Sequence, residues 1–527
     1  MGACGLKIIK FFLKGVNNLL GDKLKLTSLL VSLIAVSLSA AQPQLADNAQ
    51  TKQSVVYKRI RSLSVEACRR IAYDFLKSES EQTKSIPYLE YLLEKEKNSN
   101  LADIRALAKA YYYNNQFDLS IDLINEYISL VKGRKLKADA KEDLALYERA
   151  KQISENTLNV QLINLGSNIN SKYPEINPYV SEEENLLVYS SNKSRDYNIY
   201  VSKKLKNRTK WAKAKLAGDL VNTINDELVA GLSPNGKELF VHYTQESGFE
   251  DINTSIRIKG LFRELDNIGK KVNSTYREEG ACYSKTGDTL FFASDREGGF
   301  GGLDLYYSLK LPDGTWGKPL NMGATINTSE DENYPYIDPN STRLYFASKG
   351  HESMGGYDLF YTQWNVDAGK WEKPLNLGFP INNTYDNKTI SFTRSPRYAY
   401  ISTIMREGMG SYDIYKVVFL DKEADYLIVS GYILVKDSLG TIPFNQFNST
   451  VSITLEKDDE LYGIYSFNRK TNRFILALEP GTYYLNVEAD GYTPVKKKFT
   501  IPENHYRNKR RKINIYLEQE QGKNLSK

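Results

Sequence analysis

Apolar residues recur at helical spacing from about residue 54 to residue 157. In the stretch 104–131, Leu107, Ala108 and Tyr111 fall on one helix face, and the pair Asn114-Asn115 marks a turn. The apolar positions of a second helix follow the turn: Ile121, Leu123, Ile124 and Ile128. The stretches 85–97 and 141–153 have the pattern of flanking helices. We therefore predict an all-helical domain over residues 54–157.

Between residues 158 and 424 the pattern changes to short strands that repeat. A box related to Asn-x-Gly-x-x-Ile-Asn occurs five times, and its last Asn stands at positions 170, 225, 273, 327 and 382. Each unit continues with a turn, an apolar strand such as "TLFFAS", a loop, and a second strand such as "DLYYS". In three units Trp211, Trp316 and Trp371 open the last segment. Units of about 53 residues with four short strands are typical of propeller blades, so we predict a five-bladed β-propeller.

The fifth unit ends after "DIYKVVFL" and lacks its fourth strand. The stretch "NVQLINLG", residues 159–166, has the place of that strand in the repeat but precedes the first unit. We predict that residues 159–163 pair with the strand around residues 415–419 and complete the last blade. Such closure removes the free sheet edges that invite aggregation.

The stretch "SDREGGFGGLDLYYS", residues 294–308, has four glycines within five residues and suggests a phosphate loop, a metal loop or a turn. A phosphate loop should open a helix, but a strand lies on each side here. Carboxylates are too sparse at alternating positions for a calcium loop. We interpret the stretch as one of three matching hairpin connections, in which glycine permits positive φ and aspartate binds turn amides. The residues assigned to these turns are Gly301, Gly302, Asp304, Gly355, Gly356, Asp358 and Asp413.

From about residue 425 to residue 518, alternating strands predict a small β-sandwich of about seven strands. Residues 519–527 are predicted to be a tail.

At the N-terminal end of the chain, Lys23 and Lys25 precede a 13-residue apolar run and the small residues Ser39-Ala40-Ala41. This arrangement predicts a secretory signal peptide over residues 1–41, with a retained anchor as the alternative, and residues 42–53 are predicted to be a disordered linker.

Charge is concentrated in one place. Removing residues 1–41, which carry a net charge of +4, lowers the formal charge of the chain from +6 to +2. Residues 496–512 alone carry +7, which leaves about −5 for the rest and argues against a nucleic-acid partner. The candidate interaction patch is Lys496, Lys497, Lys498, Arg507, Lys509, Arg510, Arg511 and Lys512. It is either a solvated edge that discourages strand pairing or a contact for an anionic envelope polymer or acidic partner.

Candidate chemistry is sparse. With three His, and with Cys68 and Cys282 in different predicted domains, we expect no metal site, no cofactor and no disulfide scaffold. Five carboxylates follow the repeated Asn box in two units and are the candidates for glycoside hydrolysis: Asp226, Glu227, Glu330, Asp331 and Glu332. Their recurrence favours a structural or partner-facing role, because a catalytic site breaks repeat symmetry. We therefore expect a protein that is not an enzyme, with no catalytic residues.

These motifs carry a resemblance to known families. The helical stretch 104–131 resembles a tetratricopeptide unit, with a generic helical bundle as the alternative. The units "LYFAS…GGYDLFY" resemble the TolB-like, WD-repeat-like propellers of bacterial envelope proteins. The stretch "NRFILALEPGTYYLNVEADGYTP" resembles the carboxypeptidase-regulatory-like, transthyretin-like domain. This order is similar to that of PorE-like proteins of type IX secretion, but no OmpA-like domain follows residue 518 in this sequence.

The resemblance implies a non-catalytic cell-envelope scaffold that binds protein partners through helical repeats and propeller faces. It would be exported to the periplasm and associated with the outer membrane, as an accessory of type IX secretion or of outer-membrane organisation. Expected partners are envelope proteins, and peptidoglycan or another anionic glycan. The alternative is a propeller protein that binds or cleaves glycans, with Tyr and Trp as sugar platforms.

Overall fold

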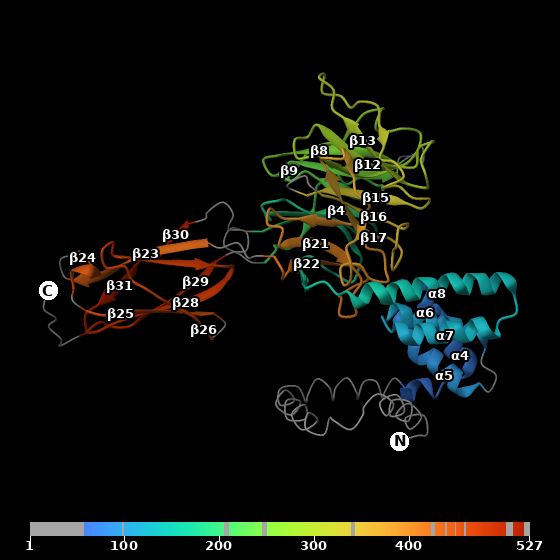
Figure 1. Cartoon of the computed structure of the whole chain (residues 1–527), viewed down its shortest axis with the longest axis horizontal. Helices are drawn as coiled ribbons and strands as arrows, with labels where there is room; N and C mark the ends of the chain where they lie inside the picture. The colour runs from blue at the N-terminus through green and yellow to red at the C-terminus, as the bar shows by residue number, and fades with distance from the viewer. Residues whose placement is uncertain are drawn as a thin grey trace.

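The computed structural model describes residues 57–96, 100–204, 210–244, 250–338, 343–422, 427–437, 440–447, 449–457, 460–501 and 510–520. It is rich in β-strands and has a helical N-terminal region (Figure 1). The predicted signal peptide, the predicted linker and the end of the predicted tail lie outside the described residues. Within the described part of the chain, no helix is long and apolar enough to cross a membrane.

The predicted helices are confirmed. They are α4 (Val65–Lys77), η1 (Gln82–Ser85), α5 (Ile86–Lys95), α6 (Leu101–Tyr113), α7 (Phe117–Leu130) and α8 (Arg134–Glu155). The turn expected at Asn114-Asn115 separates α6 from α7, and Asn115 has φ of 57°, a left-handed conformation that asparagine tolerates well. Ile104 and Ala108 on α6 pack with Ile124 on α7 in a shared core.

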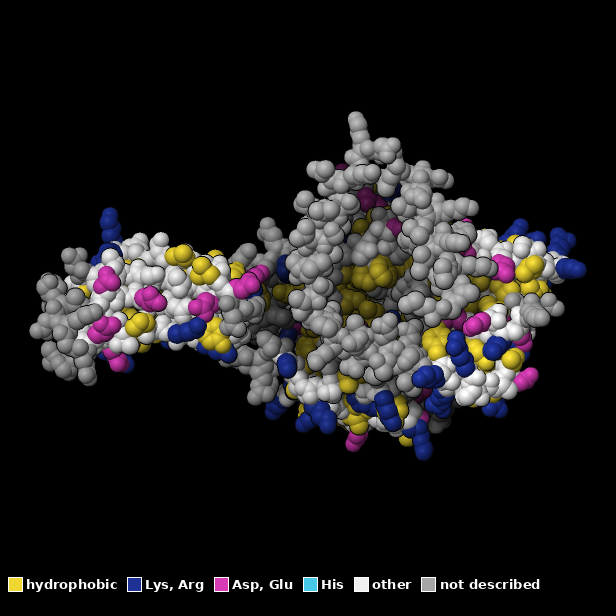
Figure 2. All heavy atoms as spheres, turned by 90° about the horizontal axis from the view of Figure 1, so that it is seen from below, with side chains coloured by type: hydrophobic (Ala, Val, Ile, Leu, Met, Phe, Trp, Pro, Cys, Tyr) yellow, Lys and Arg dark blue, Asp and Glu magenta, His cyan; other side chains and the backbone are white. Residues whose placement is uncertain are grey.

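The start of α8 carries an exposed basic cluster that the sequence analysis did not single out. Its residues are Lys132, Arg134, Lys135, Lys137 and Lys141. Figure 2 shows basic side chains gathered over the helical domain. Helix N-termini favour acidic side chains, and the first turn of α8 has none, so helix stability does not explain this cluster.

The strands between residues 160 and 419 form five antiparallel sheets among the described residues, and we call this part the five-sheet domain. The first sheet contains β2 (Glu175–Val180), β3 (Leu186–Ser194), β4 (Asp196–Lys203) and β5 (Lys215–Leu216). The second contains β6 (Glu227–Leu232), β7 (Glu238–Thr244), β8 (Glu250–Ile258) and β10 (Asp266–Asn267), with β9 (Leu261–Phe262) paired to β8.

The other three sheets repeat this order. The third contains β11 (Glu278–Tyr283), β12 (Thr289–Ser294), β13 (Asp304–Leu309) and β14 (Leu320–Asn321). The fourth contains β15 (Glu332–Ile337), β16 (Arg343–Ser348), β17 (Asp358–Asn365) and β18 (Lys370–Trp371), with β19 (Leu375–Asn376) paired to β17. The fifth contains β20 (Ile390–Phe392), β21 (Tyr398–Thr403), β22 (Asp413–Phe419) and β1 (Val160–Asn164).

The second strand of each unit is a continuous apolar run for a structural reason. In β12, five consecutive residues from Leu290 to Ser294 are buried, although neighbouring side chains point to opposite faces of a sheet. Both faces of the strand must therefore be covered. Neighbouring sheets supply the cover: Phe292 and Tyr306 of the third sheet pack with Phe240 of the second.

The predicted closure is confirmed. β1 pairs antiparallel with β22, with Val160 opposite Phe419 and Asn164 opposite Tyr415. The first strand of the domain thus completes its last sheet.

The repeat register read from the sequence was wrong in the second unit. The side chains of Asn170, Asn273, Asn327 and Asn382 each exchange two hydrogen bonds with the backbone of a third strand, such as Leu305 for Asn327. In the second unit Asn222 makes these bonds to Ile199, and Asn225 does not take that place. The shared sequence is therefore Gly-x-x-(Ile/Val)-Asn, in which the glycine has positive φ, as in Gly218.

Two further sheets lie beyond residue 426. The first contains β23 (Leu427–Asp437), β24 (Gly440–Pro443), β27 (Arg473–Leu478), β30 (Arg510–Lys512) and β31 (Ile515–Glu518). The second contains β25 (Val451–Lys457), β26 (Glu460–Tyr465), β28 (Gly481–Ala489) and β29 (Val495–Ile501). A short η2 (Phe444–Gln446) follows β24. Apolar side chains of both sheets share one core, including Val429 and Leu485.

The two basic stretches near the C-terminus lie on strands of different sheets. β29 pairs with β28, whereas β30 pairs in parallel with β23 in the other sheet. The alternation of apolar residues predicts a strand but not its neighbour, and this pairing depends on which sheet has a free edge.

The helical domain is bound to one end of the five-sheet domain. The Tyr112 hydroxyl donates to the carbonyl of Met354, and the Arg149 Nε donates to the carbonyl of Ser353 at 2.6 Å. The rings of Tyr113 and Tyr385 stack with their centroids 5.1 Å apart. The Tyr412 hydroxyl donates to Glu79 Oε1 at 2.6 Å. The loops between the second and third strands of the fourth and fifth sheets therefore face the helices.

Candidate functional site

The glycine loops are structural turns that contact the neighbouring sheet. The Asp304 carboxylate accepts hydrogen bonds from the amides of Phe300 and Gly301 at 2.7 and 3.1 Å. Asp413 accepts bonds from the amides of Met409 and Gly410 at 2.6 and 3.2 Å. Asp358 accepts one from the amide of Met354 at 2.9 Å. All three carboxylates are buried.

The four glycines that we assigned to these turns are required for space and not for positive φ, which corrects our expectation, whereas Gly298 of the first loop has φ of 88°. Gly301, Gly302, Gly355 and Gly356 all lack positive φ. A Cβ at Gly301 would lie 2.3 Å from the carbonyl oxygen of Glu330, and at Gly355 it would lie 2.6 Å from that of Asn383. At Gly302 and Gly356 it would meet carboxylates, 2.1 Å from Asp331 and 2.0 Å from Asp386. The next unit therefore approaches too closely for any side chain.

Two of the five candidate carboxylates hold turns. The Glu332 carboxylate accepts bonds from the amide and hydroxyl of Thr328 and from the Ser348 hydroxyl. Glu227 accepts the same two bonds from Thr223. Both residues are buried, and burial raises the pKa of Glu332 to about 7. These glutamates stabilise the repeat and are not exposed to a ligand.

The other three candidates reach the surface. Asp226 accepts a bond from the amide of Tyr197 at 2.6 Å and is exposed. Glu330 is exposed, and its carbonyl accepts a bond from the amide of Gly302. Asp331 is half-buried and accepts a bond from the amide of Leu303 at 3.0 Å. Asp226 and Asp331 occupy the same position of two units, four residues after Asn222 and Asn327.

The repeat symmetry is broken one residue after the turn-holding glutamate, whose place Asn387 takes in the fifth unit. This position is apolar in the first two units, where Ile176 and Leu228 occupy it. In the next three units it is Glu279, Asn333 and Lys388. A polar group has thus replaced an apolar one on three neighbouring sheets, which is what a binding site built on a repeated scaffold requires.

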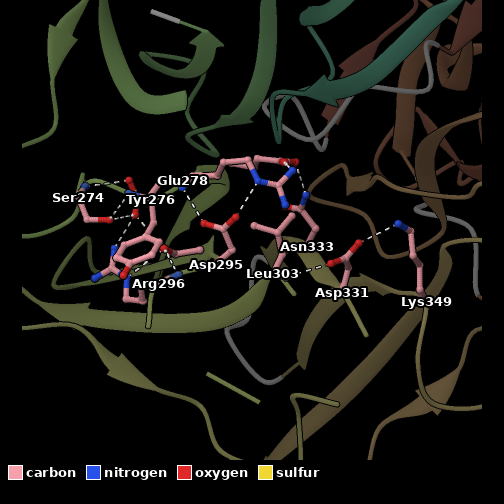
Figure 3. Close-up of polar contacts among 12 residues, drawn as sticks. Ser274, Tyr276, Glu278, Asp295, Arg296, Leu303, Asp331, Asn333 and Lys349 are labelled. Carbon is pink, nitrogen blue, oxygen red and sulfur yellow. Dashed lines mark hydrogen bonds and ion pairs between the residues drawn. The ribbon is translucent and has the colours of Figure 1, made fainter. Parts of the chain in front are cut away.

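Glu279 is the centre of a polar network that the sequence analysis missed. Its carboxylate accepts a hydrogen bond from the Asn333 side-chain amide and lies 3.4 Å from the Arg277 guanidinium. Arg277 also forms an ion pair with Asp295 at 2.9 Å, and the Arg277 amide donates to the same carboxylate at 2.7 Å. Figure 3 shows these contacts extending from the turn at Ser274 and Glu278 past Asp295 to Asn333.

Asp331, two residues before Asn333, makes a second set of polar contacts. Its carboxylate accepts bonds from the Lys349 ammonium at 2.7 Å and the Tyr357 hydroxyl at 3.1 Å (Figure 3 shows the first). Lys349 lies 4.7 Å and Lys388 5.3 Å from the centre of the Tyr357 ring. Tyr357 is also within electrostatic range of Glu279. We call the following residues the carboxylate cluster: Arg277, Glu279, Asp295, Asp331, Asn333, Lys349, Tyr357 and Lys388.

The charge state of Asp331 follows from its neighbours. Burial alone would raise the pKa of this carboxyl, but hydrogen bonds from the Lys349 ammonium and the Leu303 amide outweigh burial and hold the pKa below its usual value. Asp331 is therefore ionised at neutral pH. His242 is buried and interacts electrostatically with Glu279 and Arg277, and burial lowers its pKa, so the imidazole is neutral at neutral pH.

No group of His, Cys, Asp and Glu in the described ranges is arranged to hold a metal ion. Cys68 and Cys282 are buried and free. Asn333 and Tyr357 are buried and bonded within the cluster, so the chemistry offered to a ligand is that of three carboxylates, a guanidinium and two ammonium groups. Such a set can accept and donate hydrogen bonds to a ligand with many hydroxyl groups.

The described part of the C-terminal basic patch lies across the two sheets. Lys496 forms an ion pair with Glu456 at 2.6 Å, and Lys498 lies over the Tyr484 ring. Lys497 donates to the carbonyl of Asn514 and Arg511 donates to that of Thr500, so the edges of the two sheets meet here. Lys512 is exposed. Arg507, Lys509 and the side chain of Arg510 lie outside the described part.

No protein-family model and no curated protein matches the sequence. Solved structures do match about half of the chain. TolB from Acinetobacter baumannii shares 12% identity over 56% of this chain and 72% of its own, with a TM-score of 0.30. The catalytic domain of a Coprinopsis cinerea GH62 alpha-L-arabinofuranosidase shares 11% identity over 50% of this chain and 98% of its own, with a TM-score of 0.33. An endo-arabinase from Bacteroides thetaiotaomicron shares 16% identity over 50% of this chain and 98% of its own, with a TM-score of 0.31.

These comparisons contradict our expectation that the chain is not an enzyme, because an arabinofuranosidase and an endo-arabinase are among the similar structures. The expectation is withdrawn. The likeness itself assigns no activity to this chain, and the residues of the carboxylate cluster must carry any such assignment.

Proposed function

We propose that this protein binds carbohydrate at the carboxylate cluster. One observation carries the proposal: three neighbouring units replace an apolar residue with Glu279, Asn333 and Lys388 at the same position. The surrounding repeat keeps its structural residues, including the turn-holding Glu278 and Glu332. The change is thus confined to the position that follows the turn-holding residue.

The composition of the cluster fits a sugar better than a nucleotide or a lipid. Each sugar hydroxyl both donates and accepts hydrogen bonds, so it pairs well with a carboxylate beside a guanidinium. Tyr197 and Tyr412, at the same position of two units, are half-buried and supply aromatic surface with a polar edge, on which a sugar ring can pack. Tyr357, at that position of the fourth unit, is buried.

Glycoside cleavage is the second candidate function, and the charge state of Asp331 favours it. Retaining and inverting glycosidases need one protonated carboxyl and one ionised carboxylate on either side of the scissile bond. Asp331 is ionised because of Lys349 and the Leu303 amide, and it fits the role of nucleophile or base. Glu279 is a second carboxyl group of the cluster.

The test uses the full chain on an array of plant, bacterial and host glycans, followed by calorimetry with the best ligand. We expect Glu279→Gln and Asp331→Asn each to weaken binding at least tenfold. Asp226→Asn is the matched control, because Asp226 holds the equivalent place in a unit without the polar substitutions. Release of reducing ends from the same ligand separates cleavage from binding. Equal binding by all variants, or no glycan bound, would contradict the proposal.

The proposal includes the architecture of the three domains. We infer that the five sheets are blades of a propeller closed by β1, and that the carboxylate cluster lies at one mouth of its axis. We infer that the sheets beyond residue 426 form a transthyretin-like sandwich and that the helices are tetratricopeptide-like. The confirmed pairing of β1 with β22 supports the first inference.

We also propose that the protein acts in the cell envelope after export, near the outer membrane, with envelope proteins and an anionic glycan such as peptidoglycan as partners. The support is the basic and apolar pattern of residues 23–41 and the concentrated positive charge of residues 496–512. Fractionation of native cells, with N-terminal sequencing of the mature protein, tests export. A chain that starts at Met1 in the cytoplasm would overturn it.

A further inference from the structure

We propose that the cleft between the helical domain and the five-sheet domain binds an extended polypeptide segment that carries an acidic residue next to an aliphatic one. The cleft has a volume of about 1350 Å³. One wall comes from α5, α6 and the turn after α6, and the other from residues 379–385 and 404–411. It is separate from the carboxylate cluster, and the proposal does not depend on the proposed carbohydrate function.

The walls of this cleft are already held in place. Tyr113 stacks on Tyr385 at its side, and the Tyr112 hydroxyl and the Arg149 guanidinium each bind a carbonyl of the loop at Ser353 and Met354. A preformed cleft reduces the ordering that a ligand must cause on binding, and it therefore favours affinity.

Methionine is concentrated at this place. The chain has five methionines, and three of them lie in loops at this interface: Met354, Met405 and Met409. Met354 is fully buried in the helical core, whereas Met409 is 46% exposed and lines the cleft with Met405 and Ile404. Methionine side chains adapt to varied apolar partners and are frequent on surfaces that bind peptides. An aliphatic side chain of the ligand is the group that fits them.

The charges of the cleft call for an anionic ligand group. On the helical wall, Glu81 is paired with Lys84, and Glu90 accepts bonds from the hydroxyls of Tyr57 and Tyr111. On the opposite wall Lys172 and Arg406 are exposed, and among the described residues neither forms an ion pair with a carboxylate. The two cations thus complement an acidic side chain or a terminal carboxylate.

Polar groups for a peptide backbone are also present. The hydroxyl of Thr384, a residue that is 3% exposed and lines the cleft, has no hydrogen-bond partner in the described structure. Asn114 and Asn115 line the opposite wall with side-chain amides, which can pair with peptide groups. An oligosaccharide would use these amides but would leave the methionines and Phe379 without apolar contact, so a polypeptide is the better fit.

The test places a photo-crosslinking benzoylphenylalanine in the full chain at Met409, with the same substitution at Phe300 as the matched control. Phe300 holds the equivalent loop position in another unit, is 52% exposed and lies outside the cleft. The probe is a positional-scanning library of acetylated decapeptides. We expect crosslinking at position 409 to exceed that at position 300 at least fivefold and to select peptides with Asp or Glu beside Leu, Ile or Met.

A charge reversal supplies the second measurement. Arg406→Glu should remove the preference for acidic peptides, whereas Arg263→Glu, an exposed arginine of the second unit, should leave it unchanged. Equal crosslinking at positions 409 and 300, or no change of preference in Arg406→Glu, would overturn the proposal. An intramolecular crosslink from position 409 to residues 42–56 would identify the chain's own N-terminal segment as the occupant and would also overturn it. Glycan binding by the Arg406→Glu variant should equal that of the parent chain.

Discussion

Glu184 and Lys416 form a buried ion pair, with 2.9 Å between carboxylate and ammonium, that joins the first sheet of the five-sheet domain to the last. The same carboxylate oxygen accepts a bond from the Lys204 ammonium at 2.8 Å and one from the Tyr400 hydroxyl at 2.5 Å. Glu184 is fully buried. The pair therefore links the first and last sheets, in addition to the pairing of β1 with β22.

Glu184→Gln should destabilise the five-sheet domain by about 3–5 kcal/mol, because removing one partner of a buried ion pair leaves the others uncompensated. All four tryptophans lie between residues 211 and 371, so tryptophan fluorescence during urea unfolding reports on this domain. Glu182→Gln is the control, since Glu182 forms an exposed pair with Arg394 and should cost less than about 1 kcal/mol. Equal losses in both variants would show that the buried pair has no special role.

The stability of the domain should fall in acid through Glu184. Burial alone would raise the pKa of this carboxyl, but the Lys416 and Lys204 ammonium groups outweigh it and lower the pKa from 4.5 to about 2. A folded-state pKa below the unfolded value stabilises the protein above pH 4.5, and this contribution is lost as pH falls from 4.5 through 2. The slope of unfolding free energy against pH in this window should be smaller in Glu184→Gln. Identical slopes in the two proteins would contradict this assignment.

Asp304→Asn should destabilise the protein more than Asp358→Asn, although the two aspartates are equivalent in the repeat. Both carboxylate oxygens of Asp304 accept backbone N–H bonds, so a side-chain amide would place a donor against a donor at a cost of about 1–3 kcal/mol. In Asp358 only Oδ2 is used, by the Met354 amide and the Asn376 side chain. Urea unfolding at pH 7 measures the loss of unfolding free energy in each variant. Equal losses would show that the number of carboxylate oxygens bonded to backbone amides does not determine the effect.

The effect of Asp358 on the unfolding free energy should also depend on pH. Burial raises its pKa from 3.8 to about 7. Because the folded state holds the proton more tightly, stability is lost as pH rises from about 4 through 7, and Asp358→Asn should remove that part of the slope.

Gly302→Ala should weaken both stability and carbohydrate binding. Its Cβ would lie 2.1 Å from Asp331 Oδ1, so the carboxylate must leave the Leu303 amide and change its contact with Lys349. We expect a loss of about 1–3 kcal/mol in urea unfolding. Gly133→Ala is the control, because its Cβ would meet only the mobile side chain of Leu136. Stoichiometric nucleotide or calcium binding that disappears in Gly302→Ala would refute a structural role for this glycine.

Replacement of Arg507, Lys509, Arg510, Arg511 and Lys512 by Gln should release the protein from outer-membrane and peptidoglycan fractions without lowering its melting temperature. An exposed charge such as that of Lys512 contributes little to stability, and a charge-driven contact weakens as the Debye length falls from about 10 Å at 0.1 M salt to about 3 Å at 1 M. Sedimentation at both salt concentrations measures this. The matched control removes the five exposed basic residues at the start of α8. Unchanged co-sedimentation would identify the patch as a solvated edge only.

Local sequence patterns determined the elements of this protein. The helices between residues 65 and 155, the buried second strands such as β12, and the crossing of β1 to the last sheet could all be predicted, because each depends on apolar spacing or on a position within a repeat. The aspartates of the glycine loops could also be placed in turns, since short acids bind nearby amides.

The tertiary structure decided which residues meet. The carboxylate cluster combines side chains from three units, and its signal in the sequence, the change from Ile176 and Leu228 to Glu279, Asn333 and Lys388, is visible only in the correct register. That register depends on Asn222 and not Asn225 contacting Ile199. The space that requires Gly302 and the ion pair of Glu184 with Lys416, 232 residues apart, likewise depend on how sheets pack against one another. Contacts between distant segments are a property of this packing, which local periodicity does not encode.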